Sequence, residues 1–222
     1  MIMFDRGTSA PHACQPGSRL TFVLALLALI AASPSKTHAA DDAAAPGRAV
    51  LYEEDRADPA GRTSSGSIVW HTDTNKLAGA PDDIFVVADV DIPNKLKMTL
   101  TLKHNTDTSL PASHVFELTL VPVPGLRGGG INSVPGMLTK LNEQARGAPL
   151  AGLSVKVTDN VFLVGLSNVD ADRQRNLQAL RERSWIDIPL VDKIQHRYIL
   201  AIEKGGSGQI AFTKAFAAWG QN

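Results

Sequence analysis

The sequence has very little cysteine. Its one cysteine, Cys14, lies in an N-terminal stretch that we expect to be removed on export. A mature chain without it has no disulfide, no zinc–cysteine site and no cysteine nucleophile, so its fold must depend on the hydrophobic core alone. Aromatic residues make up only 5% of the chain. We therefore expect Trp70, Trp185 and Trp219 to lie in the core and not on a carbohydrate-binding platform.

The chain also lacks an excess of either charge, with 22 basic and 22 acidic residues. Removing residues 1–39 leaves 19 basic and 21 acidic residues, a net charge of −2. A near-neutral chain without a basic run gives no electrostatic footprint for nucleic acid. No apolar run reaches the roughly 20 residues that a membrane-spanning helix needs. We expect neither nucleic-acid binding nor a membrane span in the mature chain.

The longest apolar run, residues 20–32, has the layout of a secretory signal peptide. Arg6 and Arg19 precede it, and Thr37-His38-Ala39 follows with a small residue before the cleavage point. We predict a signal peptide at 1–39, a flexible lead-in at 40–48 and a single domain at 49–222. The chain is then periplasmic or secreted. The alternative is a signal that stays uncleaved as an N-terminal membrane anchor.

Apolar and polar residues alternate along the first half of the domain with the period of two that half-buried strands show. Between the first two strands, residues 55–67 have turn chemistry and predict a loop. A three-residue turn at Pro93–Lys95 would place Asp91 opposite Lys97 on the solvent side. The expected strands lie at 49–54, 68–72, 84–92, 96–102 and 116–120.

A hairpin followed by a charged helix organises the second half. A two-residue turn at Asp159-Asn160 would pair Val157 with Phe162, which puts the apolar residues of both strands on one face. Ser167 and Asp170 then form a capping box that opens a helix with arginines in its last turn.

Two more strands, at 185–191 and 197–204, precede a last helix that we expect Ser207 to cap. Residues 121–136 are too rich in proline and glycine for regular structure, and 137–145 fit a helix turn or a strand equally well. The apolar stripe that docks the last helix consists of Phe212, Ala215, Phe216 and Trp219. Together these patterns predict a mainly antiparallel β-sandwich, immunoglobulin-like or jelly-roll-like, with one charged helix after a hairpin and a C-terminal amphipathic helix.

Two glycine-rich segments occur where catalytic loops are often found. Gly205–Gln209 lacks the final glycine of G-x-S-x-G and is not followed by a Walker lysine, so a turn before a helix explains it. The segment Arg127, Gly128, Gly129, Gly130 is similar to the oxyanion loops of esterases, but no serine elbow accompanies it. We interpret it as a loop over one end of the sandwich and a candidate binding site.

The densest basic feature is one face of the predicted helix, with Arg173, Arg175, Arg181 and Arg183. Arg173 and Arg175 are ordinary for a solvated helix face, and they could also contact an envelope protein or an anionic surface such as lipid headgroups or polysaccharide. None of the histidines in the mature chain, at 71, 104, 114 and 196, has the spacing of a metal-ligand pair. We predict no metal and no cofactor.

The second half resembles the exported invasion-associated locus B family of alphaproteobacteria. The shared layout is a strand pair (LSVKVTD and VFLVGLS), a helix of LQALRER type, a strand of YILAIEKG type and a terminal FTKAFAAW helix, over about Leu150 to Trp219. That family usually has cysteines in this region, and this chain has none there. The mature chain also looks like uncharacterised exported proteins of rhizobial type. The resemblance implies an exported β-sandwich and brings no catalytic residue.

Three functional hypotheses follow. We favour an exported, non-catalytic binding or interaction module of the cell envelope or periplasm. The first alternative is a hydrolase or carbohydrate-active enzyme whose dispersed carboxylates, such as Asp82, Asp83 or Glu117, meet in space. The second is a structural envelope subunit, recognisable by an exposed apolar edge or patch.

Overall fold

The computed structural model describes residues 45–55, 57–75, 83–124, 126 and 128–221. The chain divides into two compact units, Met1–Ala40 and Asp41–Asn222, and every described residue belongs to the second. The predicted signal peptide lies outside the described residues. The predicted lead-in ends earlier than expected, because the first strand already begins at Gly47.

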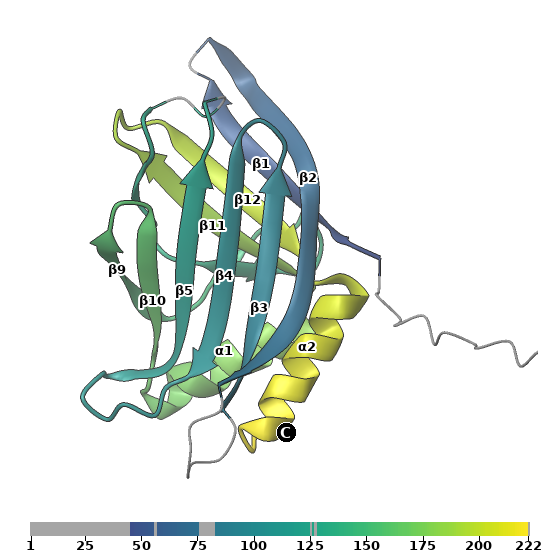
Figure 1. Cartoon of the computed structure of the whole chain (residues 1–222), viewed down its shortest axis with the longest axis vertical. Helices are drawn as coiled ribbons and strands as arrows, with labels where there is room; N and C mark the ends of the chain where they lie inside the picture. Colours follow the sequence, from purple (N-terminus) through teal and green to yellow (C-terminus); the bar gives the residue numbers. More distant parts are fainter. Residues whose placement is uncertain (1–44, 56, 76–82, 125, 127, 222) are drawn as a thin grey trace, which may run out of the picture. The chain divides into compact units, whose positions relative to one another are not determined.

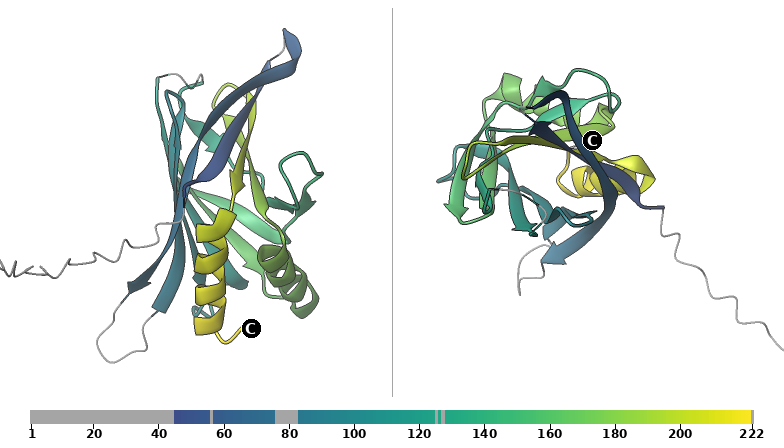
Figure 2. Two further views of the ribbon diagram at one scale, coloured as in Figure 1. Left: turned by 90° about the vertical axis from the view of Figure 1, so that its right-hand side faces the viewer. Right: turned by 90° about the horizontal axis from the view of Figure 1, so that it is seen from above.

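The described residues form 12 strands in one antiparallel sheet, and two helices (Figure 1). The sheet curls into a half-barrel, which confirms the predicted mainly antiparallel β fold with a helix after a hairpin and a second helix at the C-terminus (Figure 2). The order along the sheet is β8-β7-β11-β12-β1-β2-β3-β4-β5-β10-β9, with β6 paired to β11. The strands are β1 (Gly47–Asp55), β2 (Asp58–Asn75), β3 (Asp83–Ile92), β4 (Leu96–His104), β5 (Ala112–Pro122), β6 (Ile131–Ser133), β7 (Leu138–Lys140), β8 (Ala148–Pro149), β9 (Gly152–Thr158), β10 (Val161–Ser167), β11 (Trp185–Asp192) and β12 (Arg197–Glu203); the helices are α1 (Asp170–Glu182) and α2 (Gly205–Ala218).

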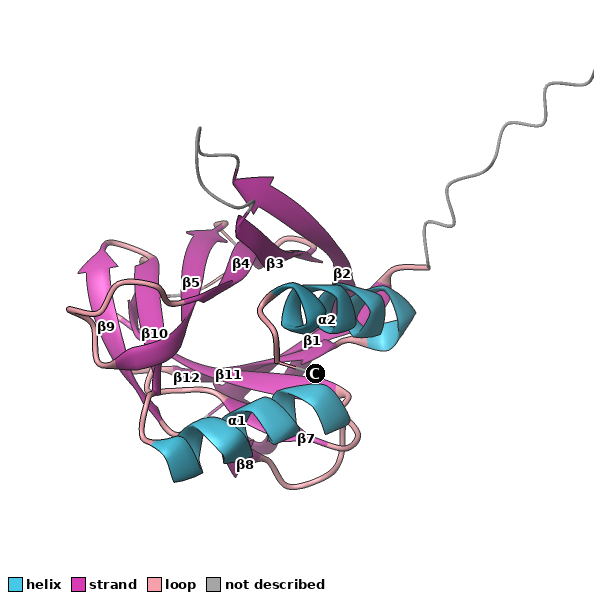
Figure 3. Cartoon of the chain, turned by 90° about the horizontal axis from the view of Figure 1, so that it is seen from below, coloured by secondary structure: helices cyan, strands magenta, loops and turns pink. Residues whose placement is uncertain are grey.

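The core lies on the inner side of the curled sheet, where alternate residues of the strands are buried. Helix α2 packs beside β1, β2 and β3 (Figure 3) through the apolar stripe predicted from the sequence. Phe212 meets Trp70 edge to face, with ring centroids 5.3 Å apart. The indole N–H of Trp70 donates to Glu203 O at 2.8 Å, and that of Trp219 donates to Ile84 O at 2.8 Å. The Trp219 bond ties the end of α2 to β3, whereas the Trp70 bond joins β2 to β12 beneath the helix.

The β3–β4 hairpin has the predicted register. Asp91 pairs with Lys97 across the strands, and their charged groups lie 3.3 Å apart. The three-residue turn contains Asn94 at φ 63°, a left-handed conformation that asparagine tolerates better than most residues. Both strands bury one face fully, so a slip of one residue would expose the whole apolar set, and this fixes the register.

The predicted loop at 55–67 is wrong, because most of it belongs to the 18-residue strand β2. Asp58 and residues 62–67 pair with β1, and Ser67 also pairs with Asp91 of β3. Serine and glycine are poor strand formers in isolation, but the antiparallel ladder to β1 holds this half of the strand, and the ladder to β3 takes over from Ser67 onward. Gly66 is required there, since a Cβ at this position would lie 2.0 Å from Asp91 O.

The predicted pairing of the β9–β10 hairpin is also wrong. A bulge next to the turn pairs Phe162 with Lys156 instead of Val157. Asn160 occupies the turn at φ 60°. The one-residue shift turns the apolar residues of β9 away from the core, while those of β10 stay in it.

The two predicted serine caps differ from the structure. Helix α1 begins at Asp170, and the Ser167 hydroxyl donates to Asp172 Oδ2 at 2.9 Å instead of capping the helix. Helix α2 begins at Gly205, so Ser207 lies inside it, and its buried Oγ has no hydrogen-bond partner among the described residues. The ambiguous segment 137–145 contains the short strand β7 and no helix.

No helix in the part of the chain that the structure describes is long and apolar enough to cross a membrane.

A candidate ligand cleft between α1 and the β7–β8 edge

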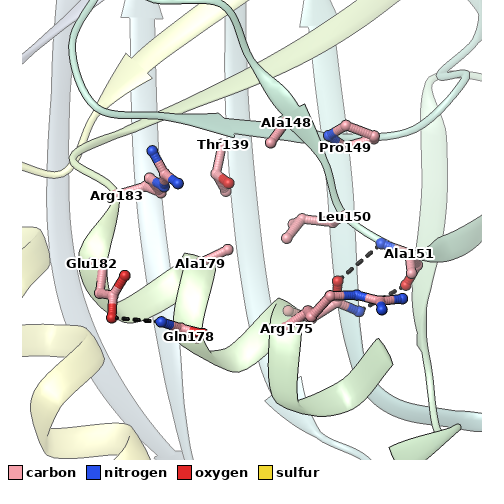
Figure 4. A pocket seen from close by; sticks show the side chains of 11 residues that line it. Thr139, Ala148, Pro149, Leu150, Ala151, Arg175, Gln178, Ala179, Glu182 and Arg183 are labelled. Atoms are coloured by element: carbon pink, nitrogen blue, oxygen red, sulfur yellow. Dashed lines mark hydrogen bonds between the residues drawn. The ribbon is translucent and has the colours of Figure 1, made fainter. Parts of the chain in front are cut away.

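A hollow lies between α1 and the short strands β7 and β8 (Figure 4). It has a volume of about 520 Å³, within the range of 300–1,000 Å³ typical of small-molecule sites. Helix α1 supplies one wall, and β7, β8 and the two residues after them supply the other. The lining residues are Thr139, Ala148, Pro149, Leu150, Ala151, Arg175, Asn176, Gln178, Ala179, Glu182 and Arg183.

Two buried polar side chains hold α1 in place. Asn176 accepts a hydrogen bond from Ala151 N at 2.9 Å and donates one to Ala151 O at 2.8 Å. At the other end of the helix, Lys204 Nζ donates to Leu180 O at 2.7 Å and to Arg181 O at 3.2 Å, where a helix leaves its carbonyls unpaired. Burial lowers the pKa of Lys204 to about 8. These bonds attach α1 to Ala151 on one wall of the cleft and to the residue that follows β12.

Thr139 has an unmet hydrogen-bonding group in this cleft. The residue is 1% exposed, and its Oγ has no partner among the described residues. Its backbone is occupied by the ladders to Ile186 of β11 and Ala148 of β8, which position the side chain firmly. A buried hydroxyl without a partner costs about 1–3 kcal/mol, so such groups are usually paired with something.

Arg183 provides an unpaired cation at the same end of the cleft (Figure 4). It caps the C-terminus of α1 in an extended conformation and is half-buried. Among the described residues, no carboxylate or carbonyl is bonded to its guanidinium. By contrast, Arg175 is paired with Asp172, and Glu182 accepts a hydrogen bond from Gln178 at 3.0 Å. The side-chain groups of the lining that lack a partner among the described residues are thus the Thr139 hydroxyl and the Arg183 guanidinium.

A buried ion pair lies next to the cleft but is already satisfied. Lys140 Nζ lies 2.8 Å from Asp187 Oδ1, and Lys140 also lies over the Trp185 ring. Burial raises the pKa of Asp187, and the hydrogen bond from Lys140 opposes that rise. The pair stabilises the β7–β11 contact and leaves no charge for a ligand.

The structure separates the site residues predicted from the sequence. Arg173 forms an ion pair with Asp170 at 2.9 Å and lines a smaller hollow of about 390 Å³ beside the β4–β5 connection. Arg175 lines the larger cleft described above. The predicted arginine face is therefore divided between two hollows: Arg173 lines one, and Arg175 and Arg183 line the other. Arg173 and Arg175 are paired with carboxylates of α1.

The glycine-rich loop lies elsewhere, against the turns that join β9 to β10 and β11 to β12. Gly128, Gly129 and Gly130 all have positive φ, at 91°, 68° and 108°. A Cβ on Gly128 would lie 1.9 Å from Oδ2 of the buried Asp192, so the loop follows that carboxylate closely. Close packing explains Gly128, whereas a Cβ on Gly129 would meet nothing within 4 Å, so its positive φ is the reason for glycine there. Arg127 lies outside the described residues.

Sequence reasoning missed a histidine pair. His104 and His114 face each other across β4 and β5, with ring centroids 5.2 Å apart, and both rings contact Trp219. His114 is fully buried, and its Nε2 lies 3.0 Å from Gln221 Oε1. Burial first, and then the neighbouring His104, lower the pKa of His114 to about 4. The alternation of β5 was the available signal. If the buried positions 116, 118 and 120 are extended by one step toward the N-terminus, they include position 114.

Sequence reasoning also missed an apolar edge. Strand β9 ends the sheet, and its outward side chains Leu153, Val155 and Val157 are 78%, 60% and 58% exposed. Leu163 of β10 lies beside Val155 on the same face. The surface was not predicted, because the expected register placed all three β9 residues in the core.

The dispersed carboxylates are not assembled into a visible site. Glu117 lies on β5 with its carboxylate 3.6 Å from Lys103, Asp83 begins β3, and Asp82 lies outside the described residues. Within the described ranges, no group of three or more His, Cys, Asp or Glu side chains is placed to hold a metal ion.

Comparison of the chain with protein-family models, with curated proteins and with solved structures finds no match.

Proposed function

We propose that the chain is an exported, non-catalytic binding module that holds a small ligand in the cleft between α1 and β7–β8. The observation that carries the proposal is the buried hydroxyl of Thr139, which has no partner within the described domain and lines a cleft of about 520 Å³. A polar atom that remains unpaired in the ligand-free protein and faces a hollow is what a binding site requires before its ligand arrives.

The lining favours binding over bond cleavage. Hydrolysis of a glycosidic bond by the common mechanisms needs two carboxylates on either side of the scissile bond. Among the residues that line the cleft, Glu182 is the single carboxylate, and it is bonded to Gln178. The remaining polar groups can orient a ligand, but they form no pair of acid and base.

Export enters the proposal from the N-terminal sequence. The apolar run at 20–32, the arginines before it and the small residue at Ala39 support a signal peptide, and the absence of cysteine after Cys14 suits a fold held by its core. The cell envelope or periplasm is therefore the proposed location, as expected from the resemblance to the invasion-associated locus B family.

The binding proposal is tested by ligand mapping on the chain from residue 41 onward. We expect members of a mixed small-fragment collection to shift the backbone amide NMR signals of Thr139, Ala148, Ala179 and Arg183 saturably. Ala148→Leu should abolish these shifts, because Ala148 is exposed at β8 and a larger side chain there would fill the cleft.

The matched control is Ala171→Leu, which adds the same side chain to an exposed position of α1 outside the cleft lining. It should leave the shifts intact. Fragments that shift only other regions, or that still shift the cleft amides in Ala148→Leu, would rule out the cleft as the binding site. A collection without any saturable binder would rule out the binding function as proposed.

A second candidate function rests on the exposed edge of β9. We propose that this edge pairs with β9 of a second copy, in antiparallel orientation and centred on Val155. Ser167 N donates to Ala151 O at 2.9 Å, so that carbonyl points toward β10. Because peptide groups alternate in direction along a strand, those of Gly152, Ser154 and Lys156 point to the open side.

The sequence of β9 is self-complementary in this arrangement. Leu153 would face Val157 of the second copy, and Ser154 would face Lys156, so no like charges meet. A lysine often protects an edge strand, but Lys156 is paired with Asp159 at 2.9 Å. This candidate corresponds to the structural envelope subunit considered above.

A further inference from the structure

The unpaired groups of the cleft call for a hydrogen-bond acceptor. A guanidinium can only donate hydrogen bonds, and the free Thr139 hydroxyl can donate one as well. Both groups lie at the same end of the cleft, where α1 ends and β7 pairs with β11 (Figure 4). An oxygen that accepts from both would satisfy the buried hydroxyl and neutralise the half-buried cation at once.

The charge of the lining favours a ligand with a single negative charge. The guanidinium of Arg175 is neutralised by Asp172, which leaves Arg183 as the cation without a partner in the described lining. Glu182, the neighbour of Arg183 in sequence, adds a negative charge to the same wall. A doubly charged anion would gain one ion pair and be repelled by this carboxylate, whereas a single charge is balanced by Arg183.

The rest of the lining is apolar. Leu150, Ala148 and Pro149 form one side, and Ala179 of α1 faces them. Leu150 is 8% exposed, so the base of the cleft is closed by the core. A ligand that fills this space must present carbon to it, because the polar side chains there, Asn176 and Gln178, are already hydrogen-bonded.

We infer that the ligand of the cleft is a small monocarboxylate with an apolar body, whose carboxylate is bound by Arg183 and Thr139 and whose carbon chain lies between Ala179 and Leu150. Carboxylate fits the planar fork of arginine and forms charge-assisted hydrogen bonds, which are about twice as strong as neutral ones. The inference rests on the proposed function, since it names the class of ligand for the same cleft.

The test compares hexanoate with hexanamide, which has the same carbon chain without the charge. Both are titrated into the chain from residue 41 onward at neutral pH, and binding is followed through the amide signals of the cleft. We expect hexanoate to bind at least about tenfold more tightly than hexanamide, a difference of about 1.4 kcal/mol.

Variants assign the carboxylate to its two partners. Arg183→Gln should weaken hexanoate binding about tenfold or more and leave hexanamide binding nearly unchanged. Arg146→Gln, at an exposed arginine outside the cleft, is the control and should change neither. Thr139→Val should weaken hexanoate binding several-fold, and because it removes the unpaired buried hydroxyl it should not destabilise the fold.

Each outcome bears on one of the two proposals. Equal affinities for the acid and the amide in the cleft would overturn the carboxylate inference and leave the binding function standing. Tighter binding of hexyl phosphate as a dianion would overturn the single-charge argument. Binding of neither probe, while other fragments still bind in the cleft, would also overturn the inference and leave the function intact.

Discussion

At the scale of single residues, the polar groups buried in this domain differ in whether they have a partner. Lys204 has carbonyl partners at the end of α1, and Asp192 accepts hydrogen bonds from Ile194 N, His196 N and the Tyr198 hydroxyl. The hydroxyls of Thr139 and Ser207 have none within the described part of the chain, and that of Thr139 lines the cleft. Because an unpaired buried group costs free energy, the position of Thr139 at the cleft is what the binding proposal depends on: a ligand there could give its hydroxyl a partner.

His114 should make the stability of the domain depend on pH. Its pKa falls from 6.5 to about 4 in the folded state, chiefly because burial disfavours the charged ring. Between these two values the unfolded chain binds more protons, so stability is complete above pH 6.5 and declines as the pH falls toward 4. One pKa unit corresponds to about 1.4 kcal/mol, so we expect a loss on the order of 3 kcal/mol at pH 4.

Urea unfolding at pH 7, 5.5 and 4 measures this loss. His114→Gln removes the titrating ring and should flatten the decline relative to the wild type. His71→Gln, at an exposed histidine, is the control and should keep the wild-type dependence. If wild type and His114→Gln lost stability in parallel, the buried ring would not be the cause.

At the scale of elements, the contact of α2 with the sheet depends on one glycine. A Cβ on Gly208 would lie 2.8 Å from Lys204 Cβ and 3.0 Å from Trp70 Cδ1, both closer than ordinary contacts. A Cβ on Gly206, in the same helical turn, would meet nothing within 4 Å. Alanine substitutions at the two positions therefore distinguish the effect of close packing on stability from the effect of helix propensity.

We expect Gly208→Ala to destabilise the domain by about 1–3 kcal/mol, because α2 must move away from Trp70. Gly206→Ala should stabilise it by about 0.5 kcal/mol through the lower conformational entropy of the unfolded chain. Thermal unfolding of the two variants measures both effects. A change of the same sign in both would show that α2 is not packed against Trp70 as closely as described.

The elements that were predicted correctly are those whose local sequence pattern is compatible with only one pairing of strands. Strands β3 and β4 alternate without interruption, and a three-residue turn fixes their register. The β9–β10 pairing was wrong because a bulge beside Val161 shifts one strand by one residue, and no local signal reports a bulge. Strand β2 was missed over its serine-rich half, where pairing with β1 outweighs weak intrinsic propensity.

The residues of the cleft could likewise be predicted only in part from the sequence. Arg175 was predicted as a binding residue, and it lines the cleft, although its charge is neutralised by Asp172. Thr139 was not predicted, because the segment 137–145 fitted a helix or a strand equally well. Its role depends on the long-range pairing of β7 with β11, which places residue 139 opposite residue 186. Sequence spacing carries no information on such a contact.

At the scale of the whole domain, the two edges of the sheet are protected unequally. One edge is β8, a strand of two residues that ends in Pro149, and short strands and proline both discourage further pairing. The other edge is β9, with seven residues, no proline and three exposed apolar side chains. The asymmetry indicates that the β9 edge is the one available for assembly.

Pairing through β9 predicts a weak, concentration-dependent dimer. A single strand buries well under the roughly 800 Å² per partner of a stable interface, so dissociation in the micromolar range or weaker is expected. Val155→Lys should abolish the dimer, because the two-fold axis would place two lysines opposite each other. Val121→Lys adds the same charge at a 54% exposed position on β5 and should leave dimerisation unchanged. Sedimentation between about 10 and 500 µM measures the average mass. If β9 pairs with a second copy, this mass rises with concentration in the wild type and in Val121→Lys, and it stays that of the monomer in Val155→Lys. A wild type that stays monomeric throughout would leave the β9 edge to a different strand, and the subunit would then not assemble with itself.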